Sequence, residues 1–68
     1  MKPTAALKDW SVERVGNSLM FFGKCYGDIK GRFPDGMPIH TSSVVSVDMT
    51  KGLVVTRNSV YQLEGFAP

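Results

Sequence analysis

The only histidine in the sequence, His40, is followed directly by three hydroxyl residues at positions 41–43. A serine hydrolase needs a nucleophilic hydroxyl, a histidine base and a carboxylate brought together in space. The pattern G-x-S-x-G, which would expose such a serine on a tight turn, does not occur in this chain. Hydroxyl side chains beside a strand more often bond to their own backbone. We therefore expect no hydrolytic site around His40.

The only cysteine, Cys25, lies within the largely apolar stretch 19–26. A thiol among apolar residues is normally buried and inert, so Cys25 is a weak candidate for a nucleophile. One cysteine forms no intramolecular disulfide, and one Cys, one His and scattered acids show no metal-ligand spacing. Small secreted domains usually depend on disulfides. We therefore expect a cytoplasmic protein that holds no metal and no cofactor.

Asp28 and Asp35 share one loop and are the nearest approach to a carboxylate pair for acid–base chemistry. Each stands next to Gly or Pro, which is how Asp is commonly used in turns. The segment 27–32 contains two Gly and a Lys, but it lacks the G-x-x-x-x-G-K-[ST] spacing of a phosphate-binding loop. With no catalytic set in the sequence, we predict that the protein is not an enzyme.

The residues best suited to binding lie in the irregular segment 27–38, which holds three Gly and two Pro. Lys30, Arg32 and Phe33 occupy its middle. Arg and aromatic side chains are enriched at the centres of protein interfaces, because they combine contact area with directed hydrogen bonds. The same residues could bind nucleic acid, the two cations meeting phosphates while Phe33 stacks on a base. In a third interpretation, Phe33 folds inward and fills one end of the core.

The rest of the chain has the pattern of strands separated by turns. Runs rich in Val, Ile, Thr, Phe and Tyr alternate with Gly, Pro, Asp and Asn. The runs cover residues 10–15, 19–26, 39–48, 53–56 and 59–63. We expect residues 1–8 to be a loose lead-in and residues 27–38 to be one long irregular loop. The pattern predicts a single all-β domain over residues 1–68, a small antiparallel meander of five or six short strands, folded as a bent sheet or a partly open SH3-like barrel.

Phe21 and Phe22 are adjacent in the second of these runs. Neighbouring residues of a strand point to opposite faces of the sheet, so the two rings cannot both enter one core. The ring left outside must be covered by the loop, by the N-terminal segment or by a second subunit. Phe22 therefore joins Lys30, Arg32 and Phe33 as a candidate partner-binding residue.

Composition limits the choice of partners. The 68 residues carry eight Lys and Arg against six Asp and Glu, which gives a net charge of +2 and a pI near 8.9. This bias is smaller than a strong nucleic-acid binder normally has. No apolar run approaches the roughly 18 residues that span a bilayer, and the N-terminal residues lack the apolar stretch of a signal peptide. We predict an accessory protein that binds another protein or itself as a homo-oligomer, without a membrane. The alternative is a nucleic-acid-binding β module that uses residues 28–38.

Overall fold

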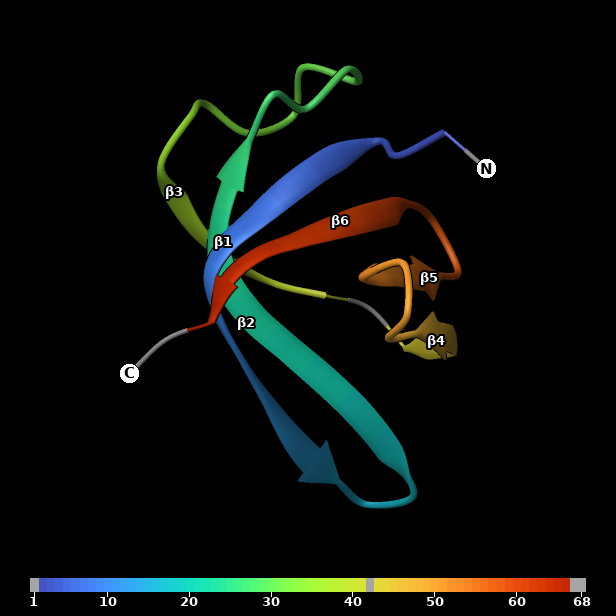
Figure 1. Cartoon of the computed structure of the whole chain (residues 1–68). Coiled ribbons are helices and arrows are strands. Elements are labelled where there is room, and N and C mark those ends of the chain that lie inside the picture. The colour runs from blue at the N-terminus through green and yellow to red at the C-terminus, as the bar shows by residue number, and fades with distance from the viewer. Residues whose placement is uncertain (1, 42, 67–68) are drawn as a thin grey trace.

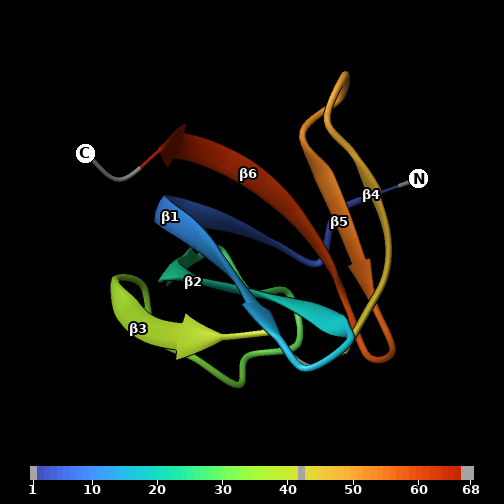
Figure 2. The same cartoon turned by 90° about the horizontal axis from the view of Figure 1, so that it is seen from below.

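The computed structural model describes residues 2–41 and 43–66, and all regular structure in this part of the chain is β. The strands are β1 (Ala5–Val15), β2 (Ser18–Tyr26), β3 (Met37–His40), β4 (Val44–Asp48), β5 (Leu53–Thr56) and β6 (Val60–Phe66). They form one six-stranded sheet in the order β3-β2-β1-β6-β5-β4 (Figures 1 and 2). The prediction of a small all-β fold with a bent sheet is therefore confirmed.

The sheet consists of two three-stranded meanders, β1-β2-β3 and β4-β5-β6, joined along β1 and β6. Strands within each meander are antiparallel, but β1 and β6 are parallel, with Ala5 opposite Tyr61 and Leu7 opposite Leu63. Turn residues predict how sequence neighbours pair, and they contain no information on how the first and last strands meet. β3 and β4 end the strand order on opposite sides, although only residues 41–43 separate them along the chain. This short connection requires the sheet to bend round on itself.

The expected loose lead-in over residues 1–8 is wrong for its second half, because β1 begins at Ala5. Ala5 and Leu7 are 5% and 0% exposed, and both face the core. Their spacing of two is that of a half-buried strand, formed here by residues with a lower preference for strands than Val or Ile. Thr4 fixes the start of the strand, since its N–H donates to the Val60 carbonyl at 2.7 Å and its Oγ1 accepts the Val60 N–H at 3.1 Å.

The run 39–48, expected from the sequence as one segment, forms two strands with a break at 41–43, and β3 starts two residues early. The irregular loop consequently covers residues 27–36. Thr41 lies in the break and is fully buried. Its Oγ1 accepts the Phe21 N–H at 3.1 Å, and its own N–H donates to the Phe21 carbonyl at 2.9 Å. These two bonds hold the connection against β2 before the chain crosses to the other meander.

The core lies on the inner face of the bent sheet. Its buried apolar members are Ala5, Leu7, Trp10, Phe21, Cys25, Val54, Tyr61 and Leu63. The Trp10 and Phe21 ring centres are 5.7 Å apart, and Phe21 is 2% exposed. Of the adjacent phenylalanine pair it is therefore Phe21 that enters the core, and Phe22 takes the outer face.

A β-bulge in β1 lies opposite Gly23 of β2. Two residues of β1, Asp9 and Trp10, stand where the partner strand offers only Gly23, and Asp9 has a φ of 51°. A Cβ atom at position 23 would lie 2.9 Å from both the Lys8 carbonyl oxygen and the Leu7 Cγ. Glycine at this position allows the backbone of the bulge to approach β2 closely.

Candidate functional site

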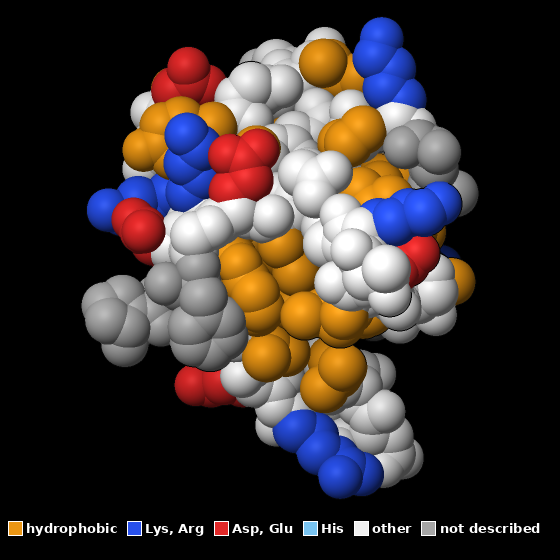
Figure 3. Space-filling model, in the orientation of Figure 1, with side chains coloured by type: hydrophobic (Ala, Val, Ile, Leu, Met, Phe, Trp, Pro, Cys, Tyr) orange, Lys and Arg blue, Asp and Glu red, His pale blue; other side chains and the backbone are white. Residues whose placement is uncertain are grey.

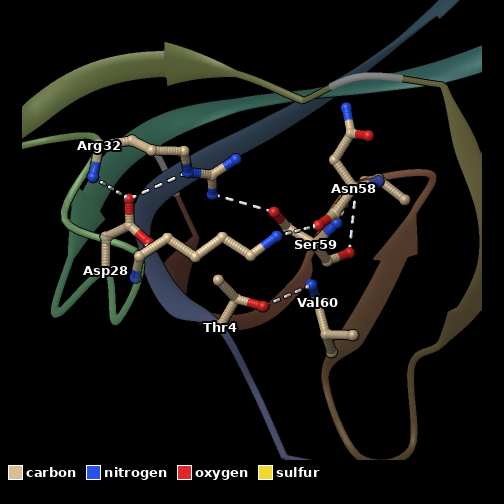
Figure 4. Close-up of polar contacts among 8 residues, drawn as sticks. Thr4, Asp28, Arg32, Asn58, Ser59 and Val60 are labelled. Carbon is tan, nitrogen blue, oxygen red and sulfur yellow. Dashed lines mark hydrogen bonds and ion pairs between the residues drawn. The ribbon is translucent and has the colours of Figure 1, made fainter.

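The loop 27–36 is fastened to the turn between β5 and β6 by two of the predicted binding residues. The Lys30 Nζ donates to the Asn58 carbonyl at 2.5 Å, and the Arg32 Nη2 donates to the Ser59 Oγ at 2.9 Å. Figure 4 shows Arg32 reaching from the loop toward Ser59, with Asn58 beside it. We call the region formed by residues 28–33 of the loop and 57–59 of the turn the junction. Lys30 and Arg32 therefore have a structural role whatever else they bind.

Arg32 is held by an ion pair inside the loop. Its Nε lies 3.3 Å from the Asp28 Oδ2, and the Asp28 side chain is 0% exposed while that of Arg32 is 34% exposed. The Asp28 carboxylate also accepts the N–H groups of Lys30 and Arg32, each at 3.0 Å. One buried carboxylate thus orders the backbone of the loop and sets the direction of the guanidinium.

These bonds favour the charged form of Asp28. Burial raises the pKa of its carboxyl, but the N–H of Lys30 and the side chain and N–H of Arg32 together outweigh this effect. The pKa of Asp28 consequently lies below its ordinary value of 3.8. Burial works against the charge of Arg32 as well, yet Asp28 and the nearby Tyr61 raise the pKa of the guanidinium. Both partners are fully ionised at neutral pH.

The turn that receives the loop is held rigid by Thr56. Its Oγ1 donates to the Ser59 carbonyl at 3.0 Å and accepts the Ser59 N–H at 3.1 Å, while its own N–H donates to the same carbonyl at 2.8 Å. Arg57, an exposed residue, occupies the first of the two central positions of this turn. The sequence indicated a tight reversal at residues 57–58 but contained no signal that the loop 27–36 would dock there.

Phe33 packs inward against the core, which is the third of the interpretations considered from the sequence. It is half-buried, and the Arg32 guanidinium carbon lies 5.1 Å from its ring centre. The ring therefore supports the guanidinium by a cation–π contact. Phe22 lies on the opposite face of the sheet, half-buried, with the ring centre of His40 6.1 Å from its own. The structure brings together Lys30, Arg32 and Phe33 and places Phe22 on another surface.

The β1–β2 hairpin extends beyond its neighbours in the sheet. β6 pairs with β1 only as far as Trp10, and β3 pairs with β2 only from Phe22 onward. Residues 11–20 therefore project from the body of the molecule as a two-stranded ribbon, which we call the arm (Figure 1). Pairing lengths of this kind depend on where distant strands end, so the local pattern did not predict the arm.

The arm carries exposed apolar side chains on both of its faces. Val12, Val15 and Leu19 are 39%, 49% and 42% exposed. Val12 is directly opposite the buried Phe21, and Leu19 is two residues from Phe21 along β2, so both continue the inner face of the sheet. Val15 lies on the outer face. In the space-filling view, hydrophobic side chains gather where the arm leaves the body (Figure 3).

A shallow hollow of about 340 Å³ lies beside the start of β1. It is lined by residues 2–6, Tyr26, Gly27, Gln62 and Glu64. Its lining combines one cation, one carboxylate, the polar side chains of Thr4, Tyr26 and Gln62, and small residues. A ligand site normally encloses most of its ligand, whereas this hollow is shallow and open to solvent.

Among the described residues weighed for catalysis, Cys25 and His40 lie on opposite faces of the sheet. Cys25 is fully buried on the inner face, and burial, followed by the charge of Asp28, raises the pKa of its thiol. His40 is exposed beside Phe22 on the outer face. Asp35 accepts the N–H of Gly27 at 2.8 Å and so braces the loop. Ser42, one of the hydroxyl residues after His40, lies outside the described residues. Among the residues that are described, no group of three His, Cys, Asp or Glu side chains could hold a metal ion.

No family model, no curated protein and no solved structure matches the chain at a significant level. Within residues 2–41 and 43–66 there is also no helix with the length and apolar character to cross a membrane. Function is therefore argued below from the two surfaces just described, the junction and the arm.

Proposed function

We propose that this chain is a non-enzymatic accessory protein that works by docking on protein chains and that associates with a second copy of itself through the arm. One observation carries the proposal, namely that the apolar inner face continues past the body of the sheet. Val12 and Leu19 extend the surface formed by Trp10 and Phe21, yet both are about two-fifths exposed. Covering them removes apolar area from water and is favourable by roughly 25 cal/mol per Å².

Covering its apolar side chains would also stabilise the arm. A two-stranded ribbon is only marginally stable in water unless another strand or a packed face supports it. A domain of 68 residues has a small core, and in the sheet the neighbouring strands pair with the hairpin only as far as Trp10 of β1 and only from Phe22 of β2. Two arms packed inner face to inner face about a two-fold axis would bury the same pair of side chains from each copy. Arg14, opposite Leu19 in the register, would lie at the polar rim of that contact.

Sedimentation equilibrium over a concentration range from about 5 to 300 µM tests this proposal. We expect the wild-type protein to dimerise within this range, because the apolar pair from each copy leaves water. We expect Leu19→Lys to be monomeric, since it would bury an unpaired ammonium group at the interface. Val15→Lys is the matched control, because Val15 is similarly exposed on the opposite face of the same arm.

A wild-type protein that stays monomeric throughout would contradict self-association. A dimer that Leu19→Lys leaves intact would place the interface elsewhere, and Phe22→Ala in the same assay tests the outer face that the sequence suggested. As for the compartment, we propose the reducing cytoplasm, because the single cysteine is a buried free thiol.

A further inference from the structure

We propose that the junction between the loop 27–36 and the β5–β6 turn binds the phosphate groups of nucleic acid, independently of the arm. Three cationic residues belong to it, Lys30 and Arg32 from the loop and the exposed Arg57 from the turn. Lys30 is bonded to the carbonyl of Asn58, the residue after Arg57, and Arg32 is bonded to Ser59, two residues after Arg57. Docking of the loop thus places cationic residues from two segments, distant in sequence, in one region of the molecule.

Charge at the junction is unbalanced. Its buried acid, Asp28, is fully engaged by the loop, and in the described part of the chain no ion pair involves Lys30 or Arg57. Lys8 and Lys24, by contrast, each have a carboxylate partner. The remaining cations without such a partner stand singly on the N-terminal segment, the arm and the β4–β5 turn. The unneutralised positive charge is therefore densest at the junction, where it complements a polyanion.

The guanidinium at the junction is pre-oriented. Arg has five N–H donors, and Asp28 and Ser59 each accept one of those of Arg32. With a third of its side chain exposed, Arg32 can still direct N–H groups at a phosphate oxygen. Asp28 acts here as a positioning residue, because it holds the guanidinium without contacting the ligand. A cation fixed in this way loses little side-chain entropy when it binds.

The position of Phe33 decides what kind of binding to expect. Its ring is half-buried and one face is covered by the Arg32 guanidinium, so it is not a free platform for a nucleic-acid base. Recognition at the junction therefore depends on phosphates, which carry no base sequence. The phosphate backbone repeats its negative charge, so neighbouring phosphates can bind cations of the loop and of the β5–β6 turn at the same time. These features favour nucleic acid, bound weakly and without sequence preference.

Fluorescence anisotropy with labelled 20-nucleotide duplex and single-stranded DNA of mixed sequence tests the proposal on the full chain. For the duplex, each phosphate neutralised contributes about −0.9 to the slope of log K against log salt, so three contacts give roughly −2.7. We expect Lys30→Ala and Arg57→Ala each to weaken binding and to reduce the size of that slope by about 0.9. Lys51→Ala, which removes an exposed cation from the β4–β5 turn at the other end of β5, is the matched control and should bind as the wild type does.

Several results would overturn the proposal. One is the absence of binding at about 20 mM salt, and another is an equal loss of affinity in Lys51→Ala and Arg57→Ala.

A competition experiment asks whether the ligand is an acidic protein instead of nucleic acid. If polyglutamate displaces DNA at an equal concentration of negative charge, the ligand is an acidic protein and the proposal is wrong. Asp28→Asn removes a negative charge, so it would tighten DNA binding if net charge alone mattered. We expect it to weaken binding because the Arg32 guanidinium is no longer held, and unchanged or tighter binding would remove the positioning role of Asp28. Leu19→Ser, which shortens the exposed apolar side chain of the arm without changing the net charge, should leave DNA binding unaffected, and this separates failure of this site from failure of the arm.

Discussion

Arg32 and Asp28, four residues apart in one loop, form an ion pair in which the carboxylate is wholly buried and the guanidinium is one-third exposed. The pair orders the loop from within, and Arg32 then bonds outward to Ser59 on the β5–β6 turn. A single side chain thus connects the local conformation of the loop to its place on the sheet. This relationship makes the loop and the turn one structural unit, and it can be tested by substitution.

Replacing Arg32 by Ala removes the charged partner of Asp28 and the bond to Ser59. We expect this change to lower the free energy of unfolding by about 1–2 kcal/mol, a moderate value because Arg32 is partly exposed to solvent. Arg57→Ala, in the neighbouring turn, is the control and should stay within about 0.5 kcal/mol of wild type. Urea unfolding followed by tryptophan fluorescence measures both. Equal stabilities for the two variants would show that the pair does not hold the loop.

Stability should fall in acid because of Asp28. Its pKa is below 3.8 in the folded protein, so the folded state binds a proton less readily than the unfolded chain does. The stabilisation from this group is complete above the unfolded-state pKa near 3.8 and is lost as pH falls through the lower folded-state pKa. We expect the stability advantage of the wild type over Asp28→Asn to be constant from about pH 7 to 5 and to shrink below pH 4. An advantage that persists unchanged at pH 2 would rule out this origin.

The two adjacent phenylalanines should differ sharply in their effect on stability. Phe21→Leu leaves a void beside Trp10 and should lower the free energy of unfolding by roughly 1–2 kcal/mol. Phe22→Leu alters a half-buried ring on the outer face and should lower it by less than about 0.5 kcal/mol. Leucine is chosen because Phe21→Ala, at about 3–5 kcal/mol, would unfold much of so small a domain. Thermal unfolding followed by circular dichroism compares the stabilities of the two leucine variants. A larger loss of stability for Phe22→Leu would mean that Phe22, and not Phe21, faces the core.

Gly23→Ala is expected to be strongly destabilising. Its Cβ would lie 2.9 Å from the Lys8 carbonyl oxygen, a backbone atom of the bulge that cannot rotate away. We expect a loss of roughly 1–3 kcal/mol. Gly27→Ala controls for the exchange itself, since position 27 has open space around it and a φ of +64°, which costs about 1 kcal/mol through the backbone alone. If both variants unfold at the same urea concentration, the close approach at the bulge is absent.

The thiol of Cys25 should be unreactive in the folded protein. Burial raises its pKa above 9.0, and the charge of Asp28 adds to that effect. At about pH 8 we expect Ellman's reagent to modify Cys25 only at the rate of unfolding, and to modify it at once in about 6 M guanidinium chloride. Rapid modification of the native protein would mean that the core opens easily at β2.

Much of the fold follows from local pattern. The alternation of Phe21 and Phe22 between faces, the turn at 57–58 and the use of Asp28 and Asp35 in loop turns all depend on residues close in sequence. Backbone preference and the period of two act over a few residues, so they can be deduced from the chain alone. The same reasoning failed at residues 5–8, because alanines in a strand lack the composition by which strands are recognised.

The arrangement of the candidate site could not be predicted from local sequence pattern. Lys30, Arg32 and Phe33 were identified by residue type, but their arrangement is a tertiary matter. The Lys30 side chain bonds to the carbonyl of Asn58, which is 28 positions away in the chain. The Phe33 ring, although it belongs to the loop, packs against a core formed by the strands. The parallel pairing of β1 with β6 and the projection of the arm are of the same kind. Contacts between distant segments depend on the free energy of the whole packed sheet, to which each local stretch contributes only a small part, so the tertiary structure alone decided which surfaces this sequence presents.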